Sequence, residues 1–140
     1  MRFVMCSLMP DMLGRGKSQT IWSAVDRVLD ISGRVLLAAF FLAGTAQKIA
    51  DPAQVEGLLA DRGLPTGLIW PAAVFTCLAG IALVVGWRLR LVALSVALYC
   101  AVTSVFHFIP SDGWQMSIFV KNWAITGGLL CLAARTPDHA

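Results

Sequence analysis

Apolar residues occupy long uninterrupted stretches of this chain, separated by short polar segments. The 25 residues from 63 to 87 and the 21 residues from 91 to 111 contain no Asp, Glu, Lys or Arg. A helix that crosses a bilayer needs about 20 predominantly apolar residues, so each stretch is long enough for one span. The link between them contains Arg88 and Arg90 and is very short, which predicts an antiparallel helical hairpin.

A shorter apolar stretch lies on either side of this hairpin. The stretches from 35 to 47 and from 122 to 134 have 13 uncharged residues each. This length alone is also typical of a buried soluble helix, but the charged side chains at both ends can extend towards the headgroups. We therefore predict an all-α fold, an integral-membrane bundle of four transmembrane helices. Their expected positions are residues 28–49, 67–87, 89–109 and 115–134.

The segment between the first two spans carries helix signals of its own. Asp51-Pro52 is a favourable helix start, because Asp caps the helix and Pro suits its first position. Val55, Leu58 and Leu59 then form one apolar stripe. The pattern predicts a short amphipathic helix over residues 52–62, lying on the outer membrane surface.

The first 20 residues show no periodic hydrophobic pattern and lack the features of a signal peptide. We expect residues 1–20 to be disordered or to precede the true start of translation, for which Met5, Met9 and Met12 are alternatives. Residues 21–136 are then the membrane domain.

Composition indicates a lipid environment rather than water. The 140 residues are 58% hydrophobic and 14% charged, with a mean hydropathy of +0.75. An ordinary soluble domain has roughly 45–50% apolar and about 25% charged residues.

The net charge of +3 does not indicate nucleic-acid binding, because the basic residues lie at the edges of apolar stretches rather than in one patch.

The basic residues are distributed unequally between the two sides of the predicted bundle. If the N-terminus is cytoplasmic, three of the 11 Lys and Arg residues lie on the outer side, namely Lys48, Arg62 and Lys121, and the other eight lie inside. Such an excess is the usual signature of the cytoplasmic side, so we predict that both termini are cytoplasmic. Four arginines are interpreted as topology anchors: Arg34, Arg88, Arg90 and Arg135.

Polar side chains from separate segments are predicted to gather at the outer end of the bundle. A charged group at the bilayer centre costs about 2.5–3.5 kcal/mol and therefore marks functional positions. Lys48 ends the first span, His107 ends the third and Lys121 lies in the outer third of the last. Together with Gln47 and Asn122 they form a candidate ligand-binding pocket. Simpler interpretations stay open, since Lys48 can extend to the headgroups and interfacial histidines are commonly structural.

Small residues in the spans predict close approach between helices, because they favour contacts between membrane helices. The glycines concerned are Gly80, Gly86, Gly127 and Gly128.

Catalytic and metal-binding patterns are absent from the sequence. The spans contain no paired carboxylates, no Ser-His-Asp set and no phosphate-binding loop. His107 and His139 are the only histidines, and no His or Cys spacing is typical of a metal or haem site, so we predict no catalytic residue, no metal and no intrinsic cofactor. We interpret the cysteines as structural thiols: Cys6, Cys77, Cys100 and Cys131.

The order of these motifs resembles the DoxX family of small four-span membrane proteins. The matching segments are RVLLAAFFLAGTAQK from Arg34 to Lys48, then GIALVVG at 80–86, His107-Phe108 and FVKN at 119–122. The resemblance extends over residues 28–134 and implies a four-helix bundle in the cytoplasmic membrane of a bacterium. Members often carry a glutamate in the second span, where this chain has Thr76 and Cys77.

The resemblance also implies a function. Some relatives resemble membrane subunits of quinone-linked oxidoreductases, and others associate with thiol-redox complexes. This implies an auxiliary, non-catalytic subunit of a membrane redox system, holding a quinone headgroup or an anionic substrate in the outer pocket. Its partners would be the lipid bilayer and either a redox protein or a second copy of the chain.

Two alternatives remain open. A small transporter is one, although the spans lack the central carboxylate that couples export to protons. The other is a membrane scaffold or assembly protein, which needs only the packing glycines and the basic anchors.

Overall fold

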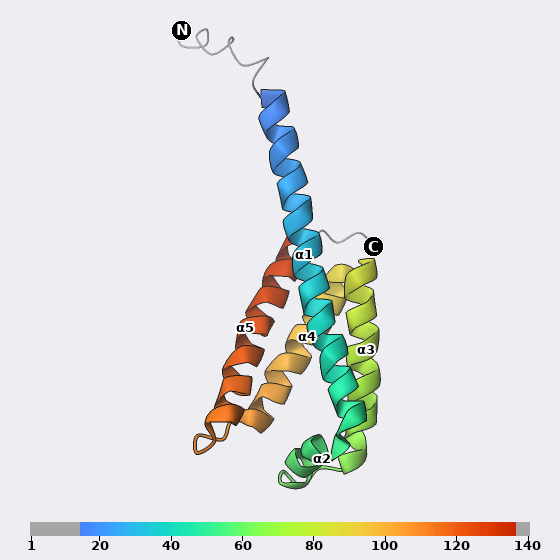
Figure 1. Ribbon diagram of the computed structural model, residues 1–140, viewed down its shortest axis with the longest axis vertical. Helices are drawn as coiled ribbons and strands as arrows, with labels where there is room; N and C mark the ends of the chain where they lie inside the picture. The colour runs from blue at the N-terminus through green and yellow to red at the C-terminus, as the bar shows by residue number, and fades with distance from the viewer. Residues whose placement is uncertain (1–14, 137–140) are drawn as a thin grey trace, which may run out of the picture. The chain divides into compact units, whose positions relative to one another are not determined.

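The structure, a computed structural model, describes residues 15–136, with side chains described from residue 23 onward. Its elements are α1 (Arg15–Ala50), α2 (Pro52–Ala60), the 3-10 helix η1 (Thr66–Leu68), α3 (Ile69–Val85), α4 (Leu89–Ser104), the 3-10 helix η2 (Val105–His107) and α5 (Gly113–Arg135) (Figure 1). No strand occurs between residues 15 and 136, which confirms the all-α prediction for this part of the chain. Helix α1 already includes residues 15–20, whereas the expectation for residues 1–14 falls outside the described residues.

Within the described part of the chain, four helical segments are long and apolar enough to cross a membrane: Ser23–Ala50, Thr66–Val85, Leu89–His107 and Gly113–Arg135. Most of their side chains face outward, because only 17–33% of the apolar window of each helix is buried. Leu36 and Val85, for example, are each 71% exposed. Apolar surface on this scale suits lipid and would drive aggregation in water, so the predicted four-span membrane bundle is confirmed.

The described chain divides into two compact units after Gly33. The N-terminal unit is the helical segment up to Gly33, and all of its described side chains, from residue 23 to residue 33, are exposed. The second unit begins at Arg34 and contains the rest of α1 and all the other helices.

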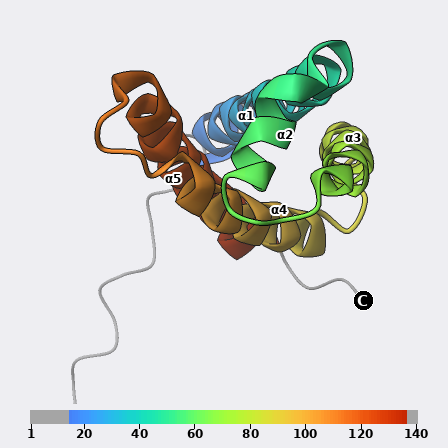
Figure 2. The same ribbon diagram turned by 90° about the horizontal axis from the view of Figure 1, so that it is seen from below.

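Each helix of the second unit contributes a narrow stripe of residues to the core. In α1 the stripe is Ala38, Phe41 and Thr45, which follow one helix face at spacings of three and four. Helix α4 packs against both α3 and α5, as the view along the bundle shows (Figure 2). The hydroxyl of Ser104 donates to the Phe119 carbonyl at 3.2 Å and so joins α4 to α5.

Helix α1 meets α3 through small residues. A Cβ at Gly80 would lie 3.0 Å from Leu42 Cγ and 3.3 Å from the Ala38 carbonyl oxygen, so the close approach predicted at Gly80 is confirmed. The same prediction is wrong for Gly127 and Gly128. Both face outward, and no described atom outside their own helix backbone comes within 4 Å of their Cβ positions.

The α3–α4 link is a tight turn built on left-handed backbone. Gly86 ends α3 with φ 79°, and Arg88, which precedes α4, has φ 41°. This turn and the C-terminal end of α5 lie at the end of the second unit opposite α2 (Figure 1). The arginines interpreted as topology anchors are placed at that end: Arg34, Arg88, Arg90 and Arg135.

The predicted short helix between the first two spans is α2, which ends at Ala60. Its apolar stripe of Val55, Leu58 and Leu59 lines a cavity of the bundle. The stripe therefore serves as a wall of a site, a role that the sequence pattern of an amphipathic surface helix did not indicate.

Candidate functional site

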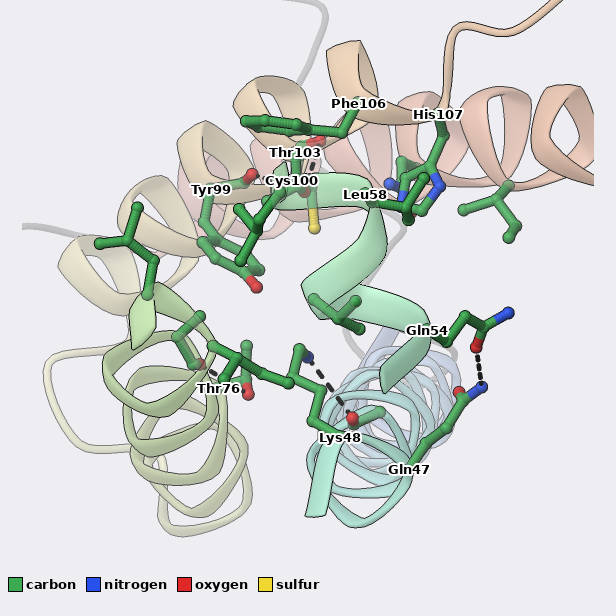
Figure 3. A pocket seen from close by; sticks show the side chains of 18 of the residues that line it. Gln47, Lys48, Gln54, Leu58, Thr76, Tyr99, Cys100, Thr103, Phe106 and His107 are labelled. Atoms are coloured by element: carbon green, nitrogen blue, oxygen red, sulfur yellow. Dashed lines mark hydrogen bonds between the residues drawn. The ribbon is translucent and has the colours of Figure 1, made fainter. Parts of the chain in front are cut away.

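A cavity of about 540 Å³ lies among α1, α2, α3, α4 and α5 (Figure 3). The residues predicted to form the polar pocket all line this cavity: Gln47, Lys48, His107, Lys121 and Asn122. They come from α1, η2 and α5, which are far apart in the sequence. The structure thus brings the candidate residues together at one cavity.

The cavity walls are mainly apolar and aromatic: Phe40, Phe41, Val55, Leu58, Leu59, Leu64, Leu68, Ile69, Phe106 and Ile118. Among the described lining residues there are two lysines and no Asp or Glu. Electrostatic interactions are strong between apolar walls because the local dielectric constant is low. The cavity therefore favours a ligand that presents oxygen acceptors or a negative charge.

Lys48 points into the bundle rather than away from it. Its ammonium nitrogen Nζ donates to the Gly44 carbonyl at 3.4 Å, one turn back along α1 (Figure 3). A lysine that extends to the headgroups would direct this nitrogen towards the helix end. An ammonium has three N–H donors, so Lys48 can donate hydrogen bonds to a ligand in addition to its bond with Gly44.

A side-chain contact also joins α1 to α2 at the cavity. Gln47 Nε2 donates to Gln54 Oε1 at 3.3 Å, and both residues line the cavity (Figure 3). This bond links α2 to the end of α1 at the exposed edge of the cavity.

His107 is positioned by α5. Its Nδ1 lies 2.7 Å from Gln115 Oε1, and an amide oxygen can only accept, so Nδ1 is the donor with this assignment. The Nε2 atom of a neutral ring is then an acceptor. Asp112 Oδ1 caps α5 by accepting from the backbone N–H of Trp114 at 2.9 Å and of Gln115 at 3.3 Å, which fixes the start of the helix.

Lys121 and Asn122 supply the α5 side of the cavity. The Lys121 ammonium lies 5.1 Å from the centre of the Phe40 ring, a cation–π contact between α5 and α1. Asn122 is 8% exposed, although amides are rarely buried without a function or a partner. Lys121 and Asn122 thus add a charged and an amide donor to the cavity lining.

Several polar lining residues were not predicted from the sequence: Gln54, Thr76, Tyr99, Cys100 and Thr103. Cys100 is buried, as a structural thiol would be, but it lies on the cavity wall. Tyr99 and Thr103 are four residues apart on α4, and Thr103 Oγ1 donates to the Tyr99 carbonyl at 2.8 Å. This spacing is a signal that could have placed a polar face on the third span.

The hydroxyls of Thr45 and Thr76 lie 2.7 Å apart and join α1 to α3 beside the cavity. Between residues 23 and 136, no group of three or more His, Cys, Asp or Glu side chains is placed to hold a metal ion.

The DoxX family model matches residues 29–108, more than half of the chain. The chain belongs to the DoxX family. It is 29% identical over 106 residues to inner membrane protein YqjF of Escherichia coli (strain K12), an alignment that covers 74% of this chain and 81% of YqjF. No solved structure matches the chain. Within this DoxX family member, Lys48 and His107 fall inside the matched residues, whereas Lys121 and Asn122 follow them.

Proposed function

We propose that this protein is an auxiliary, ligand-binding subunit of a quinone-linked membrane redox system, and that its cavity holds a quinone headgroup. The observation that carries the proposal is the convergence of Lys48, His107, Lys121 and Asn122 on one cavity. A quinone has two carbonyl acceptors on opposite sides of one ring. Lys48 on α1 and Lys121 on α5 both line the cavity and offer charged donors to such acceptors.

The size and surface of the cavity support the same ligand class. Small-molecule sites typically enclose about 300–1,000 Å³, and this one encloses about 540 Å³. Phe40, Phe106 and Leu58 offer flat or apolar surface to a ring. The surrounding lipid would accommodate an isoprenoid tail.

The side chains of the cavity bind and orient, and the bound cofactor supplies the redox chemistry. The lysine ammoniums and the Asn122 amide donate hydrogen bonds to ring oxygens. His107, held through Nδ1 by Gln115, presents Nε2 as an acceptor for a hydroxyl proton. None of these side chains can transfer electrons. A partner must therefore exchange electrons with the quinone, either a redox protein bound directly or one bound to a second copy of this chain.

The binding proposal is tested by titrating the purified protein in lipid nanodiscs with a short-tailed ubiquinone. Lys121→Met keeps the apolar stem and removes the charge, and His107→Ala removes the ring acceptor. A charged hydrogen bond is worth about 1.5–3 kcal/mol, so Lys121→Met is expected to weaken binding at least about tenfold.

Ser117→Ala is the matched control for these variants. Ser117 lies one turn before Lys121 on α5, is exposed, and donates only to the Gly113 carbonyl at 2.9 Å among the contacts described for it. It should bind like the parent. Equal affinity in Lys121→Met, His107→Ala and the parent, or no binding by the parent, would contradict the proposal.

We also propose that the protein lies in a bacterial inner membrane with both termini in the cytoplasm. The YqjF relative is named an inner membrane protein, and the anchors Arg34, Arg88, Arg90 and Arg135 lie at one end of the second unit, away from Lys48 and Lys121. Alkaline phosphatase fused to either terminus should be inactive, and green fluorescent protein at either terminus should fluoresce. Active phosphatase at one or both termini would refute this orientation.

A further inference from the structure

A second hollow of about 300 Å³ lies between α3 and α4, next to the turn that joins them. It shares no lining residue with the first cavity. Most of its wall is apolar: Phe75, Leu78, Ala79, Ala82, Leu91, Val92 and Val96. The remaining described lining residues are Trp87, Arg88 and Ser95. We call this hollow the α3–α4 groove.

The turn end of the α3–α4 groove is positively charged. Arg88 lines it, with its guanidinium carbon Cζ 5.9 Å from the centre of the Trp87 ring. Arg34 approaches the same turn, since its Nη2 donates to the Val84 carbonyl at 3.5 Å and its Nη1 lies 3.2 Å from a Cβ position at Gly86. No Asp or Glu occurs among the described residues lining the groove. The turn end therefore favours an anionic group.

The rest of the α3–α4 groove offers no free polar group to a ligand. The Ser95 hydroxyl donates to the Leu91 carbonyl at 2.8 Å, within α4. Leu78 and Leu91 are 62% and 57% exposed, so the groove is open on its lipid side. Val96 is eight positions after Arg88, which corresponds to about 12 Å along the helix and to the part of one acyl chain nearest the headgroup.

We propose that the α3–α4 groove is a binding site for an anionic phospholipid, with the phosphate at Arg88 and one acyl chain along the apolar wall. A guanidinium binds phosphate oxygens through two parallel hydrogen bonds. A zwitterionic headgroup has no net charge, so its net attraction to the guanidinium is weaker than that of an anionic headgroup. Trp87, 64% exposed at the same turn, suits the headgroup level of a bilayer. Basic pockets between membrane helices are known to bind the headgroups of anionic lipids. This proposal is independent of the quinone site.

The test measures binding of phosphatidylglycerol and of phosphatidylcholine to the purified full-length protein in detergent, by native mass spectrometry over a range of lipid concentrations. Phosphatidylglycerol should bind saturably and at least about fivefold more tightly. Arg88→Asn should remove most of this preference, and Asn tolerates the left-handed backbone of that position. Arg88→Lys should keep part of the preference, because it retains the charge but loses the two parallel hydrogen bonds of the guanidinium.

Two further variants separate a built site from general electrostatic attraction. Arg135→Gln removes a cation from the same end of the second unit but outside the α3–α4 groove, and it should change affinity less than twofold. Ser95→Trp fills the apolar part of the groove without touching the arginines, and it should weaken binding of phosphatidylglycerol at least fivefold while circular dichroism stays unchanged. Equal binding of the two lipids, equal losses in Arg88→Asn and Arg135→Gln, or full binding by Ser95→Trp would each overturn the proposal.

Discussion

Replacement of Gly80 by alanine tests the contact that holds α1 against α3. The added Cβ would lie 3.0 Å and 3.1 Å from Leu42 Cγ and Cδ2, and 3.3 Å from the Ala38 carbonyl oxygen. Leu42 is 36% exposed and can rotate away, but the Ala38 carbonyl belongs to the helix backbone and cannot. Overpacking of this kind costs about 1–3 kcal/mol, whereas replacing a helical glycine by alanine gains at most about 1 kcal/mol.

The matched control is Gly128→Ala, which receives the same gain in helix propensity at a position with no described atom within 4 Å outside its own helix backbone. The free energy of unfolding should therefore be lower in Gly80→Ala than in Gly128→Ala by about 1–3 kcal/mol. Unfolding by sodium dodecyl sulfate in mixed micelles, followed by circular dichroism, measures this difference. Equal stability of the two variants would show that α1 and α3 do not meet at Gly80.

Three other substitutions test individual contacts with the same unfolding assay. Thr76→Val removes the 2.7 Å bond to Thr45 and should lower the free energy of unfolding by about 0.6 kcal/mol, the average for polar contacts between membrane helices. Asp112→Ala removes the cap of α5 and should cost about 1 kcal/mol, with Asp112→Asn restoring most of it. Arg88→Gly relieves the left-handed backbone at φ 41° and should stabilise the protein by up to about 1 kcal/mol. No loss in the first two variants, or a loss in the third, would contradict the packing described here.

The number and length of the spans could be predicted because apolar stretches in a membrane protein must match the bilayer thickness. Because the rise per residue of a helix is regular, the sequence alone also predicts that Lys48, His107 and Lys121 lie at a similar depth in the bilayer. The structure then shows that these side chains line one cavity. Depth could be predicted because it depends only on position along each helix.

The face that each helix buries could not be predicted in the same way. Leu83 is fully buried and Val85 is 71% exposed, although both are aliphatic residues of α3. Lipid and protein core are equally apolar, so the hydrophobic pattern does not separate them. For the same reason Gly127 could not be distinguished from Gly80, and the cavity residue Cys100 could not be separated from lipid-facing ones.

The most direct test of ligand binding in the cavity uses the thiol of Cys100, which lies on the cavity wall. The other three cysteines are first replaced in the variant Cys6→Ser, Cys77→Ala, Cys131→Ala. The labelling rate of Cys100 with membrane-permeable N-ethylmaleimide is then measured with and without saturating short-tailed ubiquinone. If the cavity holds the quinone, the labelling rate should be at least several-fold slower with the quinone present, and this protection should be lost in Lys121→Met. An unchanged rate at saturating quinone would contradict binding in the cavity.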